Sequence, residues 1–238
     1  MKAVVTLSGG MDSTTAMAQA INDGFNHIVA VTIDYGSKHN PRELRSAQEI
    51  VAFYDRYKGI KVEHQSVSLP DIFGKGGSAL MLGDGVPMPH LTYEEIMESE
   101  GPSPTVVPFR NANIISLCTT IAVIEGAQTV YVGMHATDAN NWAYPDCTPE
   151  FLGAMANAVY VGSYKAVRLV FPLIWLTKEQ VCQRGLELKA PLNMTYSCYE
   201  GREQHCGKCP TCIERIEAFN WNGVADLAYY EISVEWRS

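Results

Sequence analysis

The chain has 238 residues, 47% of them hydrophobic, and a formal net charge of -8 at pH 7. This length is sufficient for one large domain with a buried core, and the acidic balance argues against a nonspecific nucleic-acid binder, which normally carries a basic face. Because we find no signal-peptide pattern and no apolar run as long as a membrane span, we expect a cytoplasmic protein that contacts neither membranes nor nucleic acid directly.

The chain begins with a short apolar strand over residues 3–7, which leads into Ser8-Gly9-Gly10-Met11-Asp12-Ser13 and a predicted helix over 13–23. Glycines let the backbone approach a phosphate closely, and the first N–H groups of a helix point at a bound anion. The spacing fits neither the Walker loop nor Gly-x-Gly-x-x-Gly. This stretch therefore predicts a phosphate site of another type; the alternative is an ordinary strand-to-helix turn.

Strands and helices then alternate along the chain. We predict strands at 27–33, 60–67, 129–132 and 167–171, and helices at 41–54, 111–125, 148–161 and 177–188. This alternation predicts an α/β fold with an open, doubly wound parallel sheet, which binds ligands at the carboxyl ends of its strands.

Residues 74–108 interrupt this alternation with many glycines and prolines, and residues 91–99 could form a short helix within them. A loop of this length inside a compact domain is usually a lid or is disordered. We expect a mobile lid over a bound nucleotide, with a purely structural insertion as the alternative.

Four of the seven cysteines fall close together, at Cys198, Cys206, Cys209 and Cys212. An odd total without a secretion signal points away from disulfides. Four thiolates at this spacing can form a closed tetrahedral zinc site, for which we expect a structural role. Two alternatives are an iron–sulfur cluster, which uses the same ligand type, and replacement of one thiol by His205.

Several motifs together resemble the QueC family of 7-cyano-7-deazaguanine synthases, which belongs to the ATP pyrophosphatases of the PP-loop superfamily. The first loop alone would indicate only the superfamily. The matching pieces are residues 8–15, Asp34-Tyr35-Gly36 with Lys38-His39, residues 107–111, Gly133, Thr137-Asp138, Tyr144-Pro145-Asp146-Cys147, Glu150-Phe151, Pro172-Leu173 with Lys178, and the four clustered cysteines.

The resemblance implies an adenine nucleotide alpha hydrolase-like fold. Residues 1–190 would form the PP-loop ATP pyrophosphatase domain, with 74–108 as its lid, and residues 191–238 a zinc-binding segment packed on it. The implied reaction joins 7-carboxy-7-deazaguanine and ammonia through an adenylated carboxylate and an amide, and a second ATP converts the amide into a nitrile. ATP, Mg²⁺ and Zn²⁺ are the implied cofactors, and a homodimer is the implied assembly.

Site residues follow from the same resemblance. Cations are required where charge develops on pyrophosphate, and carboxylates can accept hydrogen bonds from a deazapurine edge. The implied catalytic residues are Asp12, Lys38, Arg110 and Lys178, with Lys165 as a further candidate cation. The implied ATP-binding residues are Leu7, Ser8, Gly9, Gly10, Asp12, Ser13, Thr14, Asp34, Tyr35, Gly36, Arg110 and Gly133. The implied substrate-binding residues are His135, Asp138, Tyr144, Asp146 and Glu150, with Trp142 as an alternative stacking residue.

The chain departs from the common family pattern near the predicted site, and its first cysteine gap is a residue shorter than in some members. It reads Pro108-Phe109-Arg110-Asn111 where many members read Pro-Gly-Arg-Asn, and its 133–146 stretch is longer, with His135 lacking a counterpart. Three alternative functions therefore stay open. The enzyme could stop at the amide or transfer the adenylated acid to a protein amine, as in anti-phage defence systems. It could be a tRNA-modifying relative, which the acidic balance disfavours, or a non-catalytic, zinc-stabilised nucleotide sensor.

Overall fold

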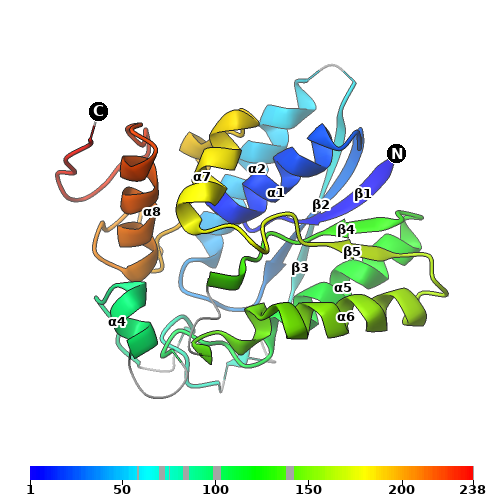
Figure 1. The fold of residues 1–238 in the computed structure, drawn as a ribbon, viewed down its shortest axis with the longest axis horizontal. Helices are drawn as coiled ribbons and strands as arrows, with labels where there is room; N and C mark the ends of the chain where they lie inside the picture. The colour runs from blue at the N-terminus through cyan, green and yellow to red at the C-terminus, as the bar shows by residue number, and fades with distance from the viewer. Residues whose placement is uncertain are drawn as a thin grey trace.

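A computed structural model describes residues 1–57, 59–69, 73–74, 76–82, 86–98, 103–137 and 142–237, apart from the side chains of residues 93 and 97. In this part of the chain one parallel sheet has the strand order β3-β2-β1-β4-β5 (Figure 1). The strands are β1 (Lys2–Thr6), β2 (His27–Asp34), β3 (Lys61–Ser68), β4 (Thr129–Tyr131) and β5 (Arg168–Val170). The helices are α1 (Met11–Asn22), α2 (Asn40–Asp55), α4 (Tyr93–Glu98), α5 (Arg110–Ile124), α6 (Pro149–Gly162), α7 (Lys178–Glu187) and α8 (Pro210–Trp221), with short 3-10 turns η2 (Pro145–Cys147) and η3 (Leu192–Met194).

Helices cover both faces of the sheet, with α1 and α2 on one face and α5 and α6 on the other (Figure 1). Because successive side chains of a strand point to opposite faces, β1 contributes to two separate cores. Ala3 and Val5 pack with residues of α1 and α2, whereas Val4 packs with residues of α5 and α6. Strands that are buried on both faces need near-continuous apolar sequences, and β1 and β2 have such sequences.

The predicted fold class, a doubly wound parallel sheet, is confirmed. The predicted strands and helices are present with ends that differ by at most two residues, and α4 lies inside the predicted 91–99 segment. Helix α8 has no counterpart among the predicted elements, because its first turn carries Pro210 and Cys212 and overlaps the cysteine cluster. Among the described residues, no helix has the length and apolar character needed to cross a bilayer.

The described parts of residues 74–108 pack on the carboxyl edge of the sheet. Leu80, Met81 and Val107 are buried in a small core together with Tyr35, which follows β2. The predicted function of this segment as a lid stays a prediction.

The C-terminal region packs on α1 and α7. Phe219 and Ala218 of α8 share a core with Met11 and Cys182. A fully buried ion pair adds to this packing: Arg215 Nε and Nη2 donate to the two carboxylate oxygens of Asp226 at 2.6 and 3.1 Å. Arg215 also donates to Thr195 Oγ1 and to the carbonyl oxygen of Leu192. Burial alone would raise the pKa of Asp226, but Arg215 more than offsets it and holds that pKa below its ordinary value.

We expect Asp226→Asn to lower the free energy of unfolding by about 3–5 kcal/mol, because removing one partner leaves a buried guanidinium without its counter-charge. Urea unfolding at pH 7, followed by circular dichroism, measures this change. The control is Asp55→Asn at the exposed end of α2, which should change stability by less than about 0.5 kcal/mol. Equal stability of the two variants would show that the pair does not hold this region.

Candidate active site

A cavity opens at the carboxyl edge of the sheet, at the ends of the neighbouring parallel strands β1 and β4, between which the strand order switches from one half of the fold to the other. In open α/β sheets this is the expected place for a ligand. The walls come from the loop before α1, the ends of β2 and β4, the starts of α2, α5 and α7, and the segment around Cys198. The lining residues are Thr6, Leu7, Ser8, Gly10, Met11, Asp12, Ser13, Val31, Ile33, Tyr35, His39, Glu43, Arg110, Asn111, Ile114, Val132, Gly133, Met134, Cys147, Lys178, Tyr196, Ser197, Tyr199 and Thr211.

The loop of residues 8–10 is shaped by hydroxyl groups. Ser8 Oγ accepts a hydrogen bond from the backbone N–H of Gly10 at 3.2 Å and lies 3.1 Å from Ser13 Oγ. The N-cap residue of α1 is Gly10, which has no side chain to cap the helix. The first N–H groups of a helix have no partner within it. The start of α1 can therefore donate to an anion in the cavity.

Two glycines allow this helix start to sit where it does. Gly9 has a left-handed φ of 85°, and a Cβ there would lie 2.5 Å from the carbonyl oxygen of Glu43 and 2.8 Å from the backbone nitrogen of Ala47. A Cβ on Gly133 would lie 2.8 Å from the backbone of Asp12. Side chains at either position would push α1 away from α2 or from the residues that follow β4.

A charged cluster borders the loop. Lys178, at the start of α7, donates to Asp12 Oδ2 at 2.8 Å and approaches Glu214 Oε2 at 3.3 Å. His135 Nε2 lies 3.8 Å from the same Asp12 oxygen. Burial raises the pKa of Asp12, but the charges of Lys178 and His135 outweigh it, so that pKa is below its ordinary value. Asp12 is thus ionised, and Lys178 is held beside the phosphate loop.

The opposite wall of the cavity combines aromatic rings with titratable groups. Arg110 Nη1 donates to Tyr35 OH at 3.2 Å, and that hydroxyl lies 3.3 Å from His39 Nε2. His39 lies 3.7 Å from Glu43 Oε2, and its ring is 5.4 Å from that of Tyr199. Burial lowers the pKa of His39 to about 3, in the same direction as Arg110 does. Burial also raises the pKa of Glu43 to about 8, against the effect of Arg110.

The structure shows why many family members have glycine at the position of Phe109 and how the phenylalanine is accommodated here. Phe109 precedes α5 with a left-handed φ of 54°, a conformation that glycine adopts more easily than other residues. Its ring lies 5.8 Å from that of Phe151. The next residue, Arg110, still reaches the cavity.

Many of the predicted site residues come together in this cavity. Gly9 and Thr14 support the loop without lining the cavity. Gly9 packs against α2, and Thr14 Oγ1 donates to the carbonyl oxygen of Gly10 at 2.8 Å. Asp34 accepts from the N–H of Gly36 at 2.9 Å and closes the turn after β2. The predicted residues that line the cavity are Leu7, Ser8, Gly10, Asp12, Ser13, Tyr35, Arg110, Gly133 and Lys178.

Two predicted cations lie elsewhere. Lys38 Nζ donates to the carbonyl oxygens of Ala79 and Val86, at 2.8 and 3.4 Å, and so holds the insertion instead of lining the cavity. Lys165 is exposed in the turn before β5, at the amino edge of the sheet.

The predicted substrate-binding residues are also dispersed. Asp146 accepts a hydrogen bond from the backbone N–H of Asn111 at 3.0 Å, so it supports the start of α5. Tyr144 OH bonds to Ser103 and Thr105. His135 is buried next to Asp12, whereas Glu150 is exposed on α6 and Trp142 is 71% exposed. Asp138 lies outside the described residues.

Several residues that line the cavity are not among the predicted site residues. His39 and Glu43 are four positions apart at the start of a predicted helix, a spacing that places them on one face and could have indicated a pair. Tyr196 and Tyr199 flank Cys198, and nothing local indicates that this segment returns to the first loop. The missed residues with polar side chains are Thr6, His39, Glu43, Asn111, Tyr196, Ser197, Tyr199, Thr211 and Glu214, the last of which contacts Lys178.

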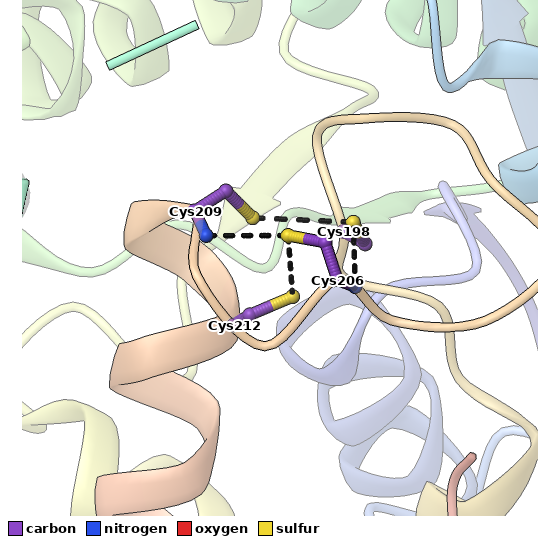
Figure 2. A group of neighbouring side chains, drawn as sticks. All are labelled: Cys198, Cys206, Cys209 and Cys212. Atoms are coloured by element: carbon purple, nitrogen blue, oxygen red, sulfur yellow. Dashed lines mark hydrogen bonds between the residues drawn. The ribbon is translucent and has the colours of Figure 1, made fainter. Parts of the chain in front are cut away.

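The four clustered cysteines converge on one point (Figure 2). Their sulfur atoms all lie within 4.8 Å of one another, and the Cys206–Cys212 and Cys198–Cys209 sulfurs are both 4.0 Å apart. Four sulfurs bound to a tetrahedral zinc ion would be about 3.8 Å apart. The donor set and its spacing therefore fit one metal ion. His205 is not a member of this set, since its Nε2 accepts from the N–H of Ser197 at 3.1 Å.

The cysteine cluster is joined to the phosphate loop by a short segment. The N–H of Tyr196 donates to the carbonyl oxygen of Gly9 at 2.9 Å. Thr211 Oγ1 donates to the carbonyl oxygen of Ser197 at 2.7 Å. Because Cys198 lies between Ser197 and Tyr199, which both line the cavity, a metal at the cluster would hold one wall of the cavity in place.

Comparison with known proteins places the whole chain in one group. The family model described as "Queuosine biosynthesis protein QueC" matches residues 2–223. The chain is 37% identical over 237 residues to the 7-cyano-7-deazaguanine synthase of Caldicellulosiruptor bescii, covering 99% of this chain and 100% of that protein. It is also 37% identical to the enzyme of the same name from Thermoplasma volcanium, covering 100% of this chain and 94% of that protein.

A solved structure shares the fold. The U34-tRNA thiolase NcsA from Methanococcus maripaludis, determined with its [4Fe-4S] cluster, superimposes with a TM-score of 0.50 and 15% identity over 93% of this chain and 67% of its own.

We expect purified protein to contain about one metal ion per chain, and Cys209→Ser to reduce this content to background, because a tetrahedral site tolerates loss of a thiolate poorly. Elemental analysis by mass spectrometry measures the metal. Cys182→Ala removes a buried thiol outside the cluster and should retain the metal. Full metal content in Cys209→Ser would contradict the assignment of these ligands.

Proposed function

The chain belongs to the QueC family, and we propose that it converts 7-carboxy-7-deazaguanine and ammonia into 7-cyano-7-deazaguanine with consumption of ATP. The observation that carries this proposal is the full-length similarity to 7-cyano-7-deazaguanine synthases. The cavity supports it, because the uncapped start of α1 and Arg110 both line it. The chain is thus an ATP-dependent enzyme that forms a C–N bond.

The first stage needs an activated carboxylate, because a free carboxylate is a poor electrophile. Its oxygen attacks the α-phosphorus of ATP, pyrophosphate leaves, and ammonia then displaces AMP to give the amide. In this proposal the N–H groups at the start of α1 and the hydroxyls of Ser8 and Ser13 hold the pyrophosphate, and Lys178 stabilises the charge that develops on it. Arg110, on the other wall, would hold the anionic end of the deazaguanine acid.

Adenosine binding would use the apolar floor of the cavity. Ile33 belongs to β2, Ile114 belongs to α5, and Met134 comes shortly after β4. A flat base could lie between these three side chains. Polar groups at a cavity edge then fix its orientation.

The described residues include suitable ligands for both implied metals, Mg²⁺ and Zn²⁺. Asp12 Oδ1 is buried and has no hydrogen-bond partner among the described residues, and a carboxylate oxygen of this kind suits Mg²⁺, which enters with ATP and would neutralise phosphate charge. The four thiolates suit Zn²⁺ in a closed site with no position for water, so we assign it a structural role.

In the second stage the amide oxygen attacks the α-phosphorus of a second ATP, and pyrophosphate leaves. AMP then leaves from the carbon, and the two amide N–H protons are lost as the nitrile forms. We also propose, as the family resemblance implies, that the enzyme is cytoplasmic and forms a homodimer. Its cysteine-bearing segment would begin after residue 190. Native mass spectrometry would measure the number of chains in the assembly.

Purified protein with ATP, Mg²⁺, ammonium and 7-carboxy-7-deazaguanine should give the nitrile with two AMP per product. Liquid chromatography with mass detection measures both. Amide with one AMP would mean that the chain stops halfway, and no AMP would overturn the enzymatic function.

Two lysine variants test, in the same assay, whether the reaction takes place in this cavity. Lys178→Met should lower kcat by about 100-fold or more, because one charged donor beside the developing pyrophosphate is lost. Lys165→Met, at the opposite edge of the sheet, should leave kcat unchanged. Equal effects of the two substitutions would contradict the role assigned to Lys178.

A further inference from the structure

One carboxyl group in the cavity has no role in the assignments above. Glu43 lies in the first turn of α2, and its side chain is 16% exposed. It makes no side-chain hydrogen bond to another described residue, and the one Lys, Arg or His nitrogen within 4 Å of its carboxylate in the described part of the chain is His39 Nε2 at 3.7 Å. A carboxyl group that lines a cavity without hydrogen-bond partners is able to act on a ligand there.

Glu43 is also next to the phosphate loop. The carbonyl oxygen of Glu43 packs so closely on Gly9 that a Cβ on Gly9 would lie 2.5 Å away. If the loop holds the β- and γ-phosphates, the α-phosphate lies next to it, and the acyl-adenylate forms there. Glu43 also lines the cavity itself, so in the proposed reaction its carboxyl group shares that cavity with the carbonyl carbon that reacts.

The proposed reaction releases protons from nitrogen in both stages. When ammonia attacks the acyl-adenylate, a C–N bond forms, the C–O bond to AMP breaks, AMP leaves with the electron pair, and nitrogen must lose one proton. When the amide becomes the nitrile, its nitrogen loses two protons as the second AMP leaves. A group in the cavity that accepts protons would speed both stages.

We propose that Glu43 is the general base of this site, and that its carboxylate takes the proton from the attacking ammonia and then the N–H protons of the amide. This role rests on the proposed function. Between these steps the neutral Glu43 acid returns its proton to water, so the carboxylate is regenerated without any further reactant.

The neighbours of Glu43 suit this role. Burial raises the pKa of Glu43 to about 8, so its carboxylate forms near neutral pH and is a stronger base than an ordinary one. His39 is no competing base, because burial and Arg110 lower its pKa to about 3. The remaining groups on this wall are Arg110 from α5 and the phenols of Tyr35 and Tyr199, and burial raises the pKa of Tyr35.

The test compares wild type, Glu43→Gln, Glu43→Asp and the control Glu49→Gln, which alters an exposed carboxylate on the same helix. Adenylation of the acid needs no base, so exchange of labelled pyrophosphate into ATP, dependent on 7-carboxy-7-deazaguanine, should stay within about threefold in Glu43→Gln. Formation of amide and nitrile should fall by about 100-fold or more, with Glu43→Asp in between and Glu49→Gln like wild type.

A pH profile at constant free NH₃ gives the second readout. The wild-type rate of amide formation should rise as pH approaches about 8, where Glu43 ionises, and the residual rate of Glu43→Gln should be independent of pH. Loss of exchange together with transfer, or an unchanged rate in Glu43→Gln, would overturn the proposal. A wild-type protein that forms neither product would overturn the proposed function and this role with it.

Folding of Glu43→Gln can be checked in the same samples. A raised pKa in the folded state means that the folded protein binds a proton more tightly than the unfolded chain between about pH 4.5 and 8, so Glu43 lowers stability as pH rises through this range. Glu43→Gln lacks this group and should melt at a higher temperature than wild type at pH 8. A lower melting temperature at pH 8 would contradict the buried, proton-accepting state of Glu43.

Discussion

The close packing around the start of α1 is the constraint on which the rest of the site depends. Gly9 lets α2 touch the loop, and Gly133 lets the residues after β4 touch Asp12. The carbonyl oxygen of Gly9 is then free to accept from Tyr196, which ties the cysteine-bearing segment to the same loop. A chain of backbone contacts thus joins the sheet, two helices and the cysteine cluster around a single cavity.

The two walls of this cavity differ in electrostatic character. Beside the loop, Lys178 and ionised Asp12 form an ion pair at 2.8 Å, which holds a positive charge where pyrophosphate would bind. On the opposite wall, burial keeps His39 neutral and moves the titration of Glu43 toward neutral pH. An enzyme that first leaves charge on phosphate and then removes protons from nitrogen requires these two environments next to each other.

Features encoded by local spacing could be predicted from the sequence. The strand–loop–helix at residues 8–13 and the four cysteines are examples, because a few neighbouring residues determine their geometry. Features that need distant segments could not be predicted in this way: Lys38 was expected at the phosphates but binds carbonyl oxygens of the insertion, and Asp146 supports α5. Tyr199 reaches the cavity because the chain after η3 returns to the first loop, a contact that no local pattern records.

The central claim is that the cysteine cluster and the phosphate loop act as one unit through residues 196–199. The most direct measurement is the affinity for ATP, by isothermal titration calorimetry with Mg²⁺ present, before and after a chelator has removed the metal from the cysteines. Our account predicts that the affinity falls by about tenfold or more, which corresponds to about 1.4 kcal/mol, while the helix content is retained. An unchanged affinity in metal-free protein would contradict it.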